Sequence, residues 1–381
     1  MANNKTFKIK NGLSAVRYLG SNGTETAGTV GYDLAGASYD SVSFSVAAQD
    51  GFPYSIRFNS NGTKMFVFGS TESVYQYSLS TGFDISTASY DSVSFSVTSQ
   101  DADPVDIVFN ADGTKMYMVG YQTDRVYQYN LSTAFDLSTA SYDSVNFSVG
   151  TQDANPRAIA FNGDGSKLYV AGVTSDAVYQ YSLSTAFDLS TASYDSVSLS
   201  VATEDTNVFS LLFNGDGSRF YILGTSDSVH QYSLTTSYDL STASYDNVSF
   251  SVSGQDTYPL GMSFNNTGTK LYISGGTGDS IYQYSTVLNT NTLDLSTGGT
   301  FSFTPSGATT VSLTNPPASG TATGFSVEVI NTGGYALTWP SSIKWHLGTA
   351  PTATASKELY TFVTTDGGTT YYGKLAGSNI A

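Results

Sequence analysis

A unit of about fifty residues occurs five times in this chain, and this repetition limits the available folds more than any other feature of the sequence. The clearest copy spans residues 140–183. A Tyr-Asp pair recurs at spacings of 51, 52, 52 and 51 residues, beginning at Tyr39, Tyr90, Tyr142, Tyr194 and Tyr245. Hairpin glycines recur at the same spacings, at Gly62, Gly113, Gly165, Gly217 and Gly268. Because a propeller blade of four short strands uses about 40–50 residues, this period predicts an all-β fold, a five-bladed β-propeller.

Each unit divides into four short segments that have the alternation of a β-strand. In the third unit these are residues 157–161, 167–170, 178–183 and 196–201. The last segment reads SVSLSV, with apolar side chains on one face and serines on the other, as a strand in a packed sheet requires. The NGDGS turn before the second segment predicts a hairpin in which Gly165 takes the left-handed conformation.

The order of these segments indicates how the ring closes. The outer-strand motif SVSFSV first occurs at residues 41–46, before any inner strand, and the last unit ends at residues 281–285 without a copy of it. The N-terminal segment is therefore expected to supply the outer strand of the fifth blade. Closure of this kind removes the exposed edges that an open sheet would have.

Charge and the rare residue types exclude several classes of function. Acidic residues outnumber basic residues by 31 to 15, and a net charge of −16 repels nucleic acid and anionic lipid. The chain has no cysteine and only two histidines, which excludes disulfides, thiolate chemistry and His-rich metal sites. No long apolar run or secretory signal is present, so neither membrane insertion nor signal-dependent export is expected.

Two ends that do not repeat flank the five units, and the chain is expected to divide into three parts. Residues 1–33 predict an N-terminal arm, disordered or used for docking, with a short hairpin at Asn11-Gly12, a dipeptide favoured in tight turns. Residues 34–286 predict the propeller. Residues 287–381 contain seven short alternating segments separated by Gly-rich turns, which predict a compact β-sandwich.

The repeat and both ends of the chain resemble known groups of proteins. The FNGDGSKLYV and VYQYSL motifs resemble the hairpins of lactonase-like and surface-layer β-propellers. The repeat with the consensus FDLSTASYDSVSFSV is similar to propeller repeats in structural and fibre proteins of marine bacteriophages. The TWPSSIKWHLGTAP and LYTFVTTDGGTTYYGK segments resemble a C-terminal module of phage tail-fibre and virion-surface proteins. The opening FKIKNGLSAVRYL resembles the start of such proteins, where the N-terminal piece docks on the particle.

The resemblance implies a non-enzymatic virion structural protein on the particle surface, either a fibre or tail-associated adhesin or a capsid-decorating protein. The implied partners are other virion proteins, held by the N-terminal arm and the C-terminal domain, and a host surface glycan or neighbouring subunits, held by the propeller. Synthesis in the host cytoplasm and a homo-oligomeric state, commonly a trimer for fibres, are expected. A bacterial lectin is disfavoured because no signal peptide is seen.

The five copies differ mainly in two loops, and these loops are the expected binding surface. One loop precedes the inner strand and the other joins the two middle strands, so both lie on one rim of a propeller. Aromatic and charged side chains on this variable rim suit sugar stacking or protein contact, although drift of tolerant loops gives the same pattern. The candidate ligand-binding residues are Phe52, Tyr54, Asp103, Asp106, Tyr121, Arg125, Arg157, Phe209 and Tyr258.

A polysaccharide depolymerase or glycosidase is the main alternative function, because such enzymes place two or three carboxylates around a sugar bond. Acids that recur in every blade are expected to be turn or blade-to-blade hydrogen-bond partners instead. One such family is Asp50, Asp101, Asp153, Asp205 and Asp256, and another is Glu72, Asp124, Asp176, Asp227 and Asp279. The acids without counterparts in other blades are Asp103, Asp106 and Glu204.

No cofactor is expected. The alternating oxygen-bearing side chains at residues 110–114 are similar to a calcium loop, but the distal Glu of an EF-hand is missing and a two-stranded turn explains the pattern. Neither a catalytic residue nor a metal ligand is therefore assigned from the sequence.

Overall fold

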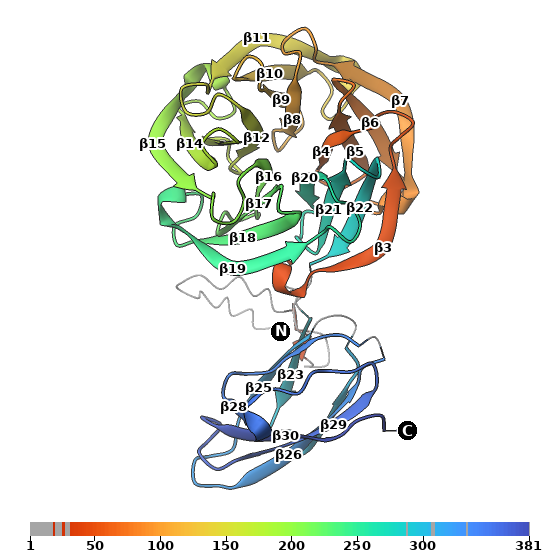
Figure 1. Cartoon of the computed structure of the whole chain (residues 1–381), viewed down its shortest axis with the longest axis vertical. Helices are drawn as coiled ribbons and strands as arrows, with labels where there is room; N and C mark the ends of the chain where they lie inside the picture. Colours follow the sequence, from red (N-terminus) through yellow and green to blue (C-terminus); the bar gives the residue numbers. More distant parts are fainter. Residues whose placement is uncertain are drawn as a thin grey trace, which may run out of the picture. The chain divides into compact units, whose positions relative to one another are not determined.

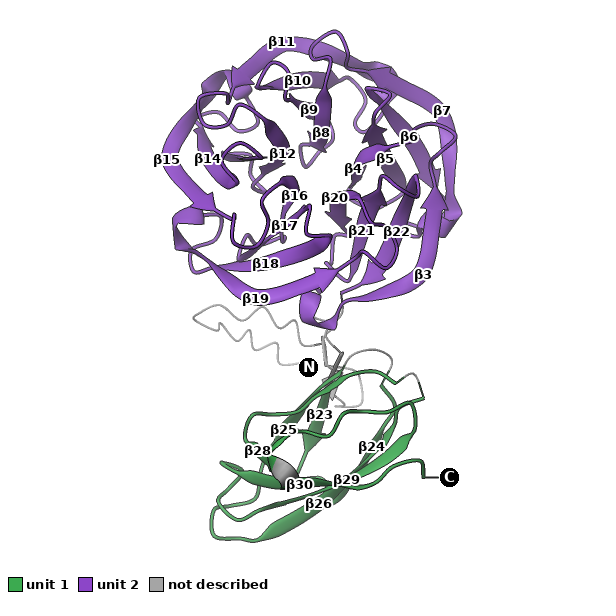
Figure 2. Ribbon diagram, viewed as in Figure 1, with its two compact units in different colours: residues 1–30, 288–381 green, residues 31–287 purple. Residues whose placement is uncertain are grey.

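The computed structural model describes residues 31–286, 289–305, 309–332 and 334–380, together with two short strands, β1 (Tyr18–Leu19) and β2 (Glu25–Thr26). The chain divides into two compact units (Figure 2). We call residues 31–287 the first unit, which the key of Figure 2 labels unit 2, and residues 1–30 and 288–381 the second unit, which the key labels unit 1. The hairpin expected at Asn11-Gly12 lies outside the described residues. Among the described helices, none has the length and apolar character that crossing a membrane would need.

The first unit is a five-bladed β-propeller in which each blade is a four-stranded antiparallel sheet (Figure 1). The inner strands surround the centre of the ring, and they are β4 (Pro53–Phe58), β8 (Pro104–Phe109), β12 (Pro156–Phe161), β16 (Val208–Phe213) and β20 (Pro259–Phe264). The second strands are β5 (Lys64–Gly69), β9 (Lys115–Gly120), β13 (Lys167–Gly172), β17 (Arg219–Gly224) and β21 (Lys270–Gly275).

The outer half of each blade consists of a third and a fourth strand. The third strands are β6 (Ser73–Leu79), β10 (Arg125–Leu131), β14 (Ala177–Leu183), β18 (Ser228–Leu234) and β22 (Ser280–Ser285). The outermost strands are β7 (Ala88–Ser96), β11 (Ala140–Ser148), β15 (Ala192–Ser200), β19 (Ala243–Ser251) and β3 (Ser38–Ser45).

The ring closes through strands from the two ends of the repeat region. The N-terminal strand β3 pairs with β22, and the register joins Ser38 to Ser285 and Ser45 to Ser280. This arrangement confirms the closure expected from the sequence. It also leaves the fifth blade with the same four strands as the others, so no outer edge lacks its strand.

The outer strands begin earlier than expected, and this corrects the predicted start at residues 41 and 196. In the third blade β15 already begins at Ala192, and its register shifts beside Gln180 and Tyr181. At this bulge Ser196 has a φ of 59°, a conformation that serine rarely takes and that the sequence does not signal. Before each outer strand, an Asp accepts a hydrogen bond from the backbone of a single 3-10 turn, as Asp188 does from Ser190 N at 3.0 Å.

The propeller core lies between neighbouring blades. One apolar cluster combines Ala158 and Tyr169 of the third blade with Leu211 and Phe220 of the fourth, all of them buried. Tyrosines of the third strands pack edge-on against a phenylalanine of the preceding blade, as in the Tyr181–Phe147 pair at 5.5 Å between ring centroids. Each blade therefore buries its faces only when both neighbours are in place.

Residues 289–380 of the second unit form two sheets that share one apolar cluster. Its buried residues include Val327, Trp339, Tyr360 and Phe362. Residues 289–380 contain eight described strands, β23 to β30, one more than expected, because β23 was not predicted. One sheet has the order β23 (Asn289–Asp294), β25 (Thr309–Thr314) and β27 (Leu337–Thr338). The other has the order β24 (Thr300–Phe303), β26 (Thr323–Ile330), β29 (Lys357–Thr364), β30 (Tyr371–Gly377) and β28 (Ile343–Trp345).

Candidate functional site

The two divergent loops of each blade lie side by side, because one buried aspartate ties them together. In the first blade Asp50 accepts hydrogen bonds from Phe52 N at 2.8 Å and from Thr71 N at 3.0 Å. Asp50 is 1% exposed, and its counterparts in the other blades bind the same two loops. The expectation that this family of acids supplies turn hydrogen bonds is confirmed. These bonds define the variable rim.

The opposite rim is built from the connections that are nearly identical in every copy. Phe83 N donates to Gly62 O at 3.0 Å, and a Cβ on Gly62 would meet the Phe83 ring at 2.3 Å, so glycine is required there. The propeller's own chain ends lie at this invariant rim as well. Tyr32 N donates to Gly268 O at 2.6 Å, and Thr286 N donates to Thr269 O at 3.0 Å.

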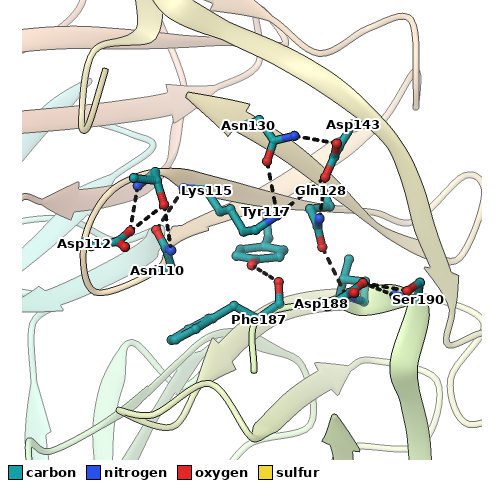
Figure 3. Close-up of polar contacts among 12 residues, drawn as sticks. Asn110, Asp112, Lys115, Tyr117, Gln128, Asn130, Asp143, Phe187, Asp188 and Ser190 are labelled. Carbon is teal, nitrogen blue, oxygen red and sulfur yellow. Dashed lines mark hydrogen bonds and ion pairs between the residues drawn. The ribbon is translucent and has the colours of Figure 1, made fainter. Parts of the chain in front are cut away.

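Blade-to-blade hydrogen bonds explain why so much of the repeat is invariant (Figure 3). Tyr117 of the second blade donates to Phe187 O of the third at 2.6 Å. Within the second blade, Asp143 accepts from Lys115 at 3.5 Å and from Gln128 at 2.5 Å. These residues stabilise the ring. The residues that differ among the blades lie mainly on the variable rim.

Four aromatic rings from three blades form a continuous row on the variable rim, which we call the aromatic arc: Phe209, Tyr258, Phe52 and Tyr54. Successive ring centroids lie 5.9, 5.4 and 5.7 Å apart, within the range of favourable aromatic pairs. The residues lie in or just before the inner strands β16, β20 and β4. Tyr258 is 42% exposed and the other three rings are partly exposed. The arc is therefore an accessible surface of stacked rings.

Tyr121 and Arg157 extend this surface toward the second and third blades. The guanidinium carbon of Arg157 lies 4.3 Å from the centroid of the Tyr121 ring, a cation–π contact. Burial raises the pKa of the Tyr54 hydroxyl, the charge of Asp50 adds to this shift, and the nearby Arg157 opposes it. The arc and the Tyr121–Arg157 pair together place side chains from all five blades on the variable rim.

Two further candidates lie on the rim but make separate contacts. The side chain of Asp103 is partly exposed and contributes to the raised pKa of Tyr54, after burial and the larger effects of Asp50, Arg157 and Tyr121. Arg125 is exposed at the start of β10 and donates to Asn146 of the outer strand at 2.6 Å. Arg125 is therefore directed to the outer half of its blade and does not join the arc.

Asp106 is not a rim residue, which corrects its expected position. It is 2% exposed on the inner strand β8, where both carboxylate oxygens bind Nη2 of Arg57, at 2.8 and 3.0 Å. Ser55 Oγ donates to the same carboxylate at 2.6 Å, and Ile159 N does so at 3.0 Å. The sequence analysis did not identify Arg57 as the partner of Asp106. The available signal was that this arginine and this aspartate are each unique among the inner strands and lie in adjacent blades.

The three acids without counterparts do not form a shared constellation among the described residues. Asp106 is engaged by Arg57, and Glu204 accepts from Tyr232 at 2.8 Å in the place where other blades use a glutamine. In the part of the chain that the structure describes, no cluster of three or more His, Asp or Glu side chains could hold a metal. Asp112 of the NGDGS-type turn accepts from Thr114 N at 2.9 Å, so its oxygen closes the turn.

The second unit contains a cavity of about 330 Å³ that the sequence did not suggest. It is lined in part by Val311, Leu313, Pro316, Trp339, Pro340 and Tyr371. The indole Nε1 of Trp339 is buried and has no hydrogen-bond partner in the described residues. The feature of the sequence that corresponds to this cavity is the Trp339-Pro340 dipeptide between two short strands, β27 and β28.

The comparisons with known proteins give a likeness of fold and no family. No protein-family model and no curated protein matches the chain. A functionally unknown protein from Desulfotomaculum acetoxidans is 15% identical with a TM-score of 0.39, over 58% of this chain and 79% of the other. A Bacteroides uniformis protein provisionally described as a 6-phosphogluconolactonase is also 15% identical with a TM-score of 0.39, over 61% of this chain and 66% of the other. At this level of similarity, these structures carry no argument about function.

Proposed function

We propose that this chain is a non-enzymatic binding protein of a bacteriophage particle, and that the aromatic arc of its propeller binds a glycan on the host surface. The single observation behind the proposal is that the arc occupies positions where otherwise similar blades differ. Phe209, Tyr258 and Tyr54 come from different blades, yet their rings form one accessible row with Phe52. Repeat copies diverge in this way where a surface serves something other than the fold.

The chemistry of the arc suits a sugar ligand. The C–H faces of a pyranose ring are apolar and flat, and they pack against aromatic faces, while sugar hydroxyls need polar groups at the edge. The hydroxyls of Tyr54 and Tyr258 supply such groups on the rings themselves, and Asp103 adds a carboxylate on the same rim. A row of rings, rather than one deep pocket, favours a chain of sugars over a single monosaccharide.

The position of the chain ends agrees with display of the variable rim. Residues 32 and 286, where the chain enters and leaves the propeller, are held at the invariant rim by Gly268 and Thr269. Anything that anchors the rest of the chain is therefore attached to the rim opposite the arc. The arc stays accessible when the propeller is held from its ends.

The test is binding of the full-length chain to an array of bacterial surface polysaccharides and their oligosaccharides. We expect binding to at least one structure, and a loss of about tenfold or more in affinity in Tyr258→Ala and in Phe52→Ala, because each change removes a stacking face. Tyr372→Ala is the control, since Tyr372 is an exposed tyrosine of the second unit, 59% accessible against 42% for Tyr258.

Thermal unfolding of each variant separates loss of binding from loss of fold. The proposal is overturned if no polysaccharide on the array binds, or if the arc variants bind as well as the unaltered protein. Loss of binding in Tyr372→Ala, with binding intact in Tyr258→Ala, also overturns it and would transfer the activity to the second unit.

The particle setting rests on the resemblance of the two ends and the repeat to phage proteins. In this proposal the N-terminal arm and the C-terminal unit, taken as a β-sandwich, attach to other virion proteins, and the chain is a homo-oligomer. Mass spectrometry of purified particles with copy numbers tests it. Hundreds of copies per particle indicate capsid decoration, a few tens indicate a tail or fibre adhesin, and absence from particles overturns the setting.

The depolymerase alternative has no specific observation in its favour. It needs two or three carboxylates around one sugar bond, whereas Asp106 is bound to buried Arg57 and Glu204 is bound to Tyr232. Release of reducing ends from a bound polysaccharide by the full-length chain, lost in Asp103→Asn, would favour this alternative over the proposal.

A further inference from the structure

Arg157 differs from every other residue at its position in the repeat. The counterparts in the other blades are Tyr54, Val105, Phe209 and Leu260. Arg157 lies near the start of β12, is partly exposed, and holds its guanidinium 4.3 Å from the centroid of the Tyr121 ring. An aromatic face fixes the plane of a guanidinium and leaves its outer edge free for hydrogen bonds.

This guanidinium has no partner for its charge within the described residues. The other described arginines of the propeller are bound: Arg57 to Asp106, Arg219 to Tyr32 O at 3.0 Å and Arg125 to Asn146 at 2.6 Å. Arg157 makes no ion pair or hydrogen bond to any described residue, and its Nε is buried and unpartnered. An unpaired arginine is notable in a chain with 31 acidic residues and 15 basic ones.

A second unmet polar group lies two residues before Arg157, in the loop that leads into β12. The backbone N of Asn155 is held by Asp153 at 2.8 Å, but its side-chain Oδ1 is buried and without a partner in the described chain. Buried polar atoms nearly always find partners in folded proteins. The donor Arg157 Nε and the acceptor Asn155 Oδ1, two residues apart, both lack a partner in the described chain. We therefore expect a ligand, or water bound with it, to supply the missing hydrogen bonds.

The unpaired charge lies at one end of the aromatic arc. Ser55, next to Tyr54, and Ile159, two residues after Arg157, donate to the same Asp106 carboxylate at 2.6 and 3.0 Å, so the inner strands that carry Tyr54 and Arg157 lie close together. Tyr54 is joined through Phe52 to Tyr258. A ligand that covers the arc therefore reaches the guanidinium. The group that satisfies a guanidinium best is a carboxylate, which accepts two parallel hydrogen bonds from its fork.

We propose that the arc is selective for an acidic saccharide, with the carboxylate of a uronic acid bound by Arg157 and the adjoining sugar rings stacked on Tyr54, Phe52 and Tyr258. This inference rests on the proposed function, because it names the class of glycan for the same surface. The net charge of −16 opposes the approach of a long polyanion, so an oligosaccharide with one or a few carboxylates is the ligand that fits.

The test compares two ligands that differ only in the charged group. The probes are a glucuronic-acid-containing oligosaccharide and the same oligosaccharide after reduction of its carboxyl to a hydroxymethyl group. Binding to the full-length chain is measured by titration calorimetry near physiological ionic strength. We expect the acidic form to bind at least about tenfold more tightly, the difference that one charged hydrogen-bonded pair supplies.

Variants assign this selectivity to Arg157. Arg157→Met keeps a long side chain without the charge and is expected to equalise the two affinities, and Arg157→Lys is expected to retain only part of the preference because it lacks the fork. Arg125→Met, which removes an exposed arginine of the same rim, is the control and is expected to keep the full preference. Thermal unfolding checks that each variant is folded.

The outcomes separate this inference from the function on which it rests. Equal binding of both probes by the unaltered protein, with loss in Tyr258→Ala, overturns the acidic selectivity and leaves glycan binding intact. Preference for a sulfated oligosaccharide over the uronic one overturns the assignment of a carboxylate. An unchanged preference in Arg157→Met overturns the role of Arg157, and binding to no saccharide of any class overturns both proposals.

Discussion

The guanidinium of Arg57 and the carboxylate of Asp106 join the first two blades among the inner strands, with Nη2 2.8 Å from Oδ1 and 3.0 Å from Oδ2. Arg57 Nη1 also donates to Met262 O of the fifth blade at 2.9 Å. Asp106 accepts from Ile159 N of the third blade. One buried ion pair thus connects four of the five inner strands, in a position that other blades fill with small or apolar side chains.

Removal of one partner of this pair is expected to destabilise the propeller strongly. Asp106→Ala leaves Arg57 buried without a counter-charge, and such changes lower the free energy of unfolding by about 3–5 kcal/mol. Urea unfolding followed by far-UV circular dichroism measures the change. Asp103→Ala is the matched control, because Asp103 is a partly exposed rim residue, and it is expected to stay within about 0.5 kcal/mol.

A double variant tests whether the unpaired charge is the cause. Arg57→Met combined with Asp106→Leu replaces both charges by apolar groups, and it is expected to recover most of the lost stability. A double variant as unstable as Asp106→Ala would assign the loss to the hydrogen bonds from Ile107 and Ile159 instead.

His230 is expected to make the stability of the propeller depend on pH below neutrality. It is 8% exposed and replaces the tyrosine of the other blades, and burial lowers its pKa below the ordinary 6.5, against the opposing charges of Asp205 and Glu204. The unfolded chain therefore takes up a proton at higher pH than the folded chain does. The free energy of unfolding has its full value above about pH 6.5, and it falls as the pH decreases toward the folded-state pKa of His230.

Two reciprocal variants identify His230 as the source. His230→Tyr restores the repeat residue and places a hydroxyl near Ser226, in the arrangement that Tyr127 has with Thr123 at 2.8 Å. This variant is expected to lose the pH dependence between about pH 5 and 7. Tyr127→His is expected to add a second dependence of the same sign, and thermal melts across this range would contradict the account if neither variant changes the slope.

Asp124→Asn is expected to raise stability at neutral pH. Burial, and then the charges of Asp101 and Asp153, raise the pKa of the Asp124 carboxyl, so its ionised form is less favourable in the folded state. This loss of folding stability is fully present above the folded-state pKa of Asp124, and it disappears as the pH falls below the unfolded-state pKa of about 3.9. Asn suits the φ of 54° at this position. Melting temperatures should therefore differ at pH 7 and converge near pH 3, whereas an equal gain at both would point to backbone conformation.

Phe66→Tyr is expected to add a hydrogen bond that four blades have and one lacks. Tyr117, Tyr169, Tyr221 and Tyr272 each donate to a carbonyl of the next blade, and Phe66 occupies the same position in the first blade. The new hydroxyl should bond to Phe135 O and stabilise the fold by about 1 kcal/mol. Tyr117→Phe should cost about the same, and equilibrium unfolding measures both; a destabilised Phe66→Tyr would mean that the first two blades lie too close to admit the oxygen.

Repetition made most of the fold predictable from the sequence. The period, the four strands and the invariant Asp50 family follow from patterns that occur five times, and closure by β3 follows from the order of the motifs. The early start of the outer strands did not follow, because serine at position 196 carries no sign of its left-handed backbone. Strand β23 and its parallel pairing with β25 depend on contacts between distant segments, which alternation cannot reveal.

The sequence predicted which residues make up the candidate site, but it did not predict how their side chains are arranged. Comparison of the copies identified Phe52, Tyr258 and Arg157 as unusual residues of one rim, but it could not show that the rings touch across blades. The predicted rim position of Asp106 was wrong, because the sequence pattern of a unique acid is the same whether its side chain faces solvent or a buried cation. Its partner Arg57 lies in a preceding blade, and only the closed ring brings the two together.

The antiparallel seam between β3 and β22 also determines how the ring responds to mechanical force. Ser38 pairs with Ser285, so the chain enters and leaves the propeller at the same end of one strand pair. Tension that separates the two ends peels this seam open one hydrogen bond at a time, which requires little force. Tension applied to both ends together, against a ligand held at the opposite rim, acts along both strands, so that many hydrogen bonds share the force. A tether that uses both ends would therefore be stronger than a tether that pulls on either end alone.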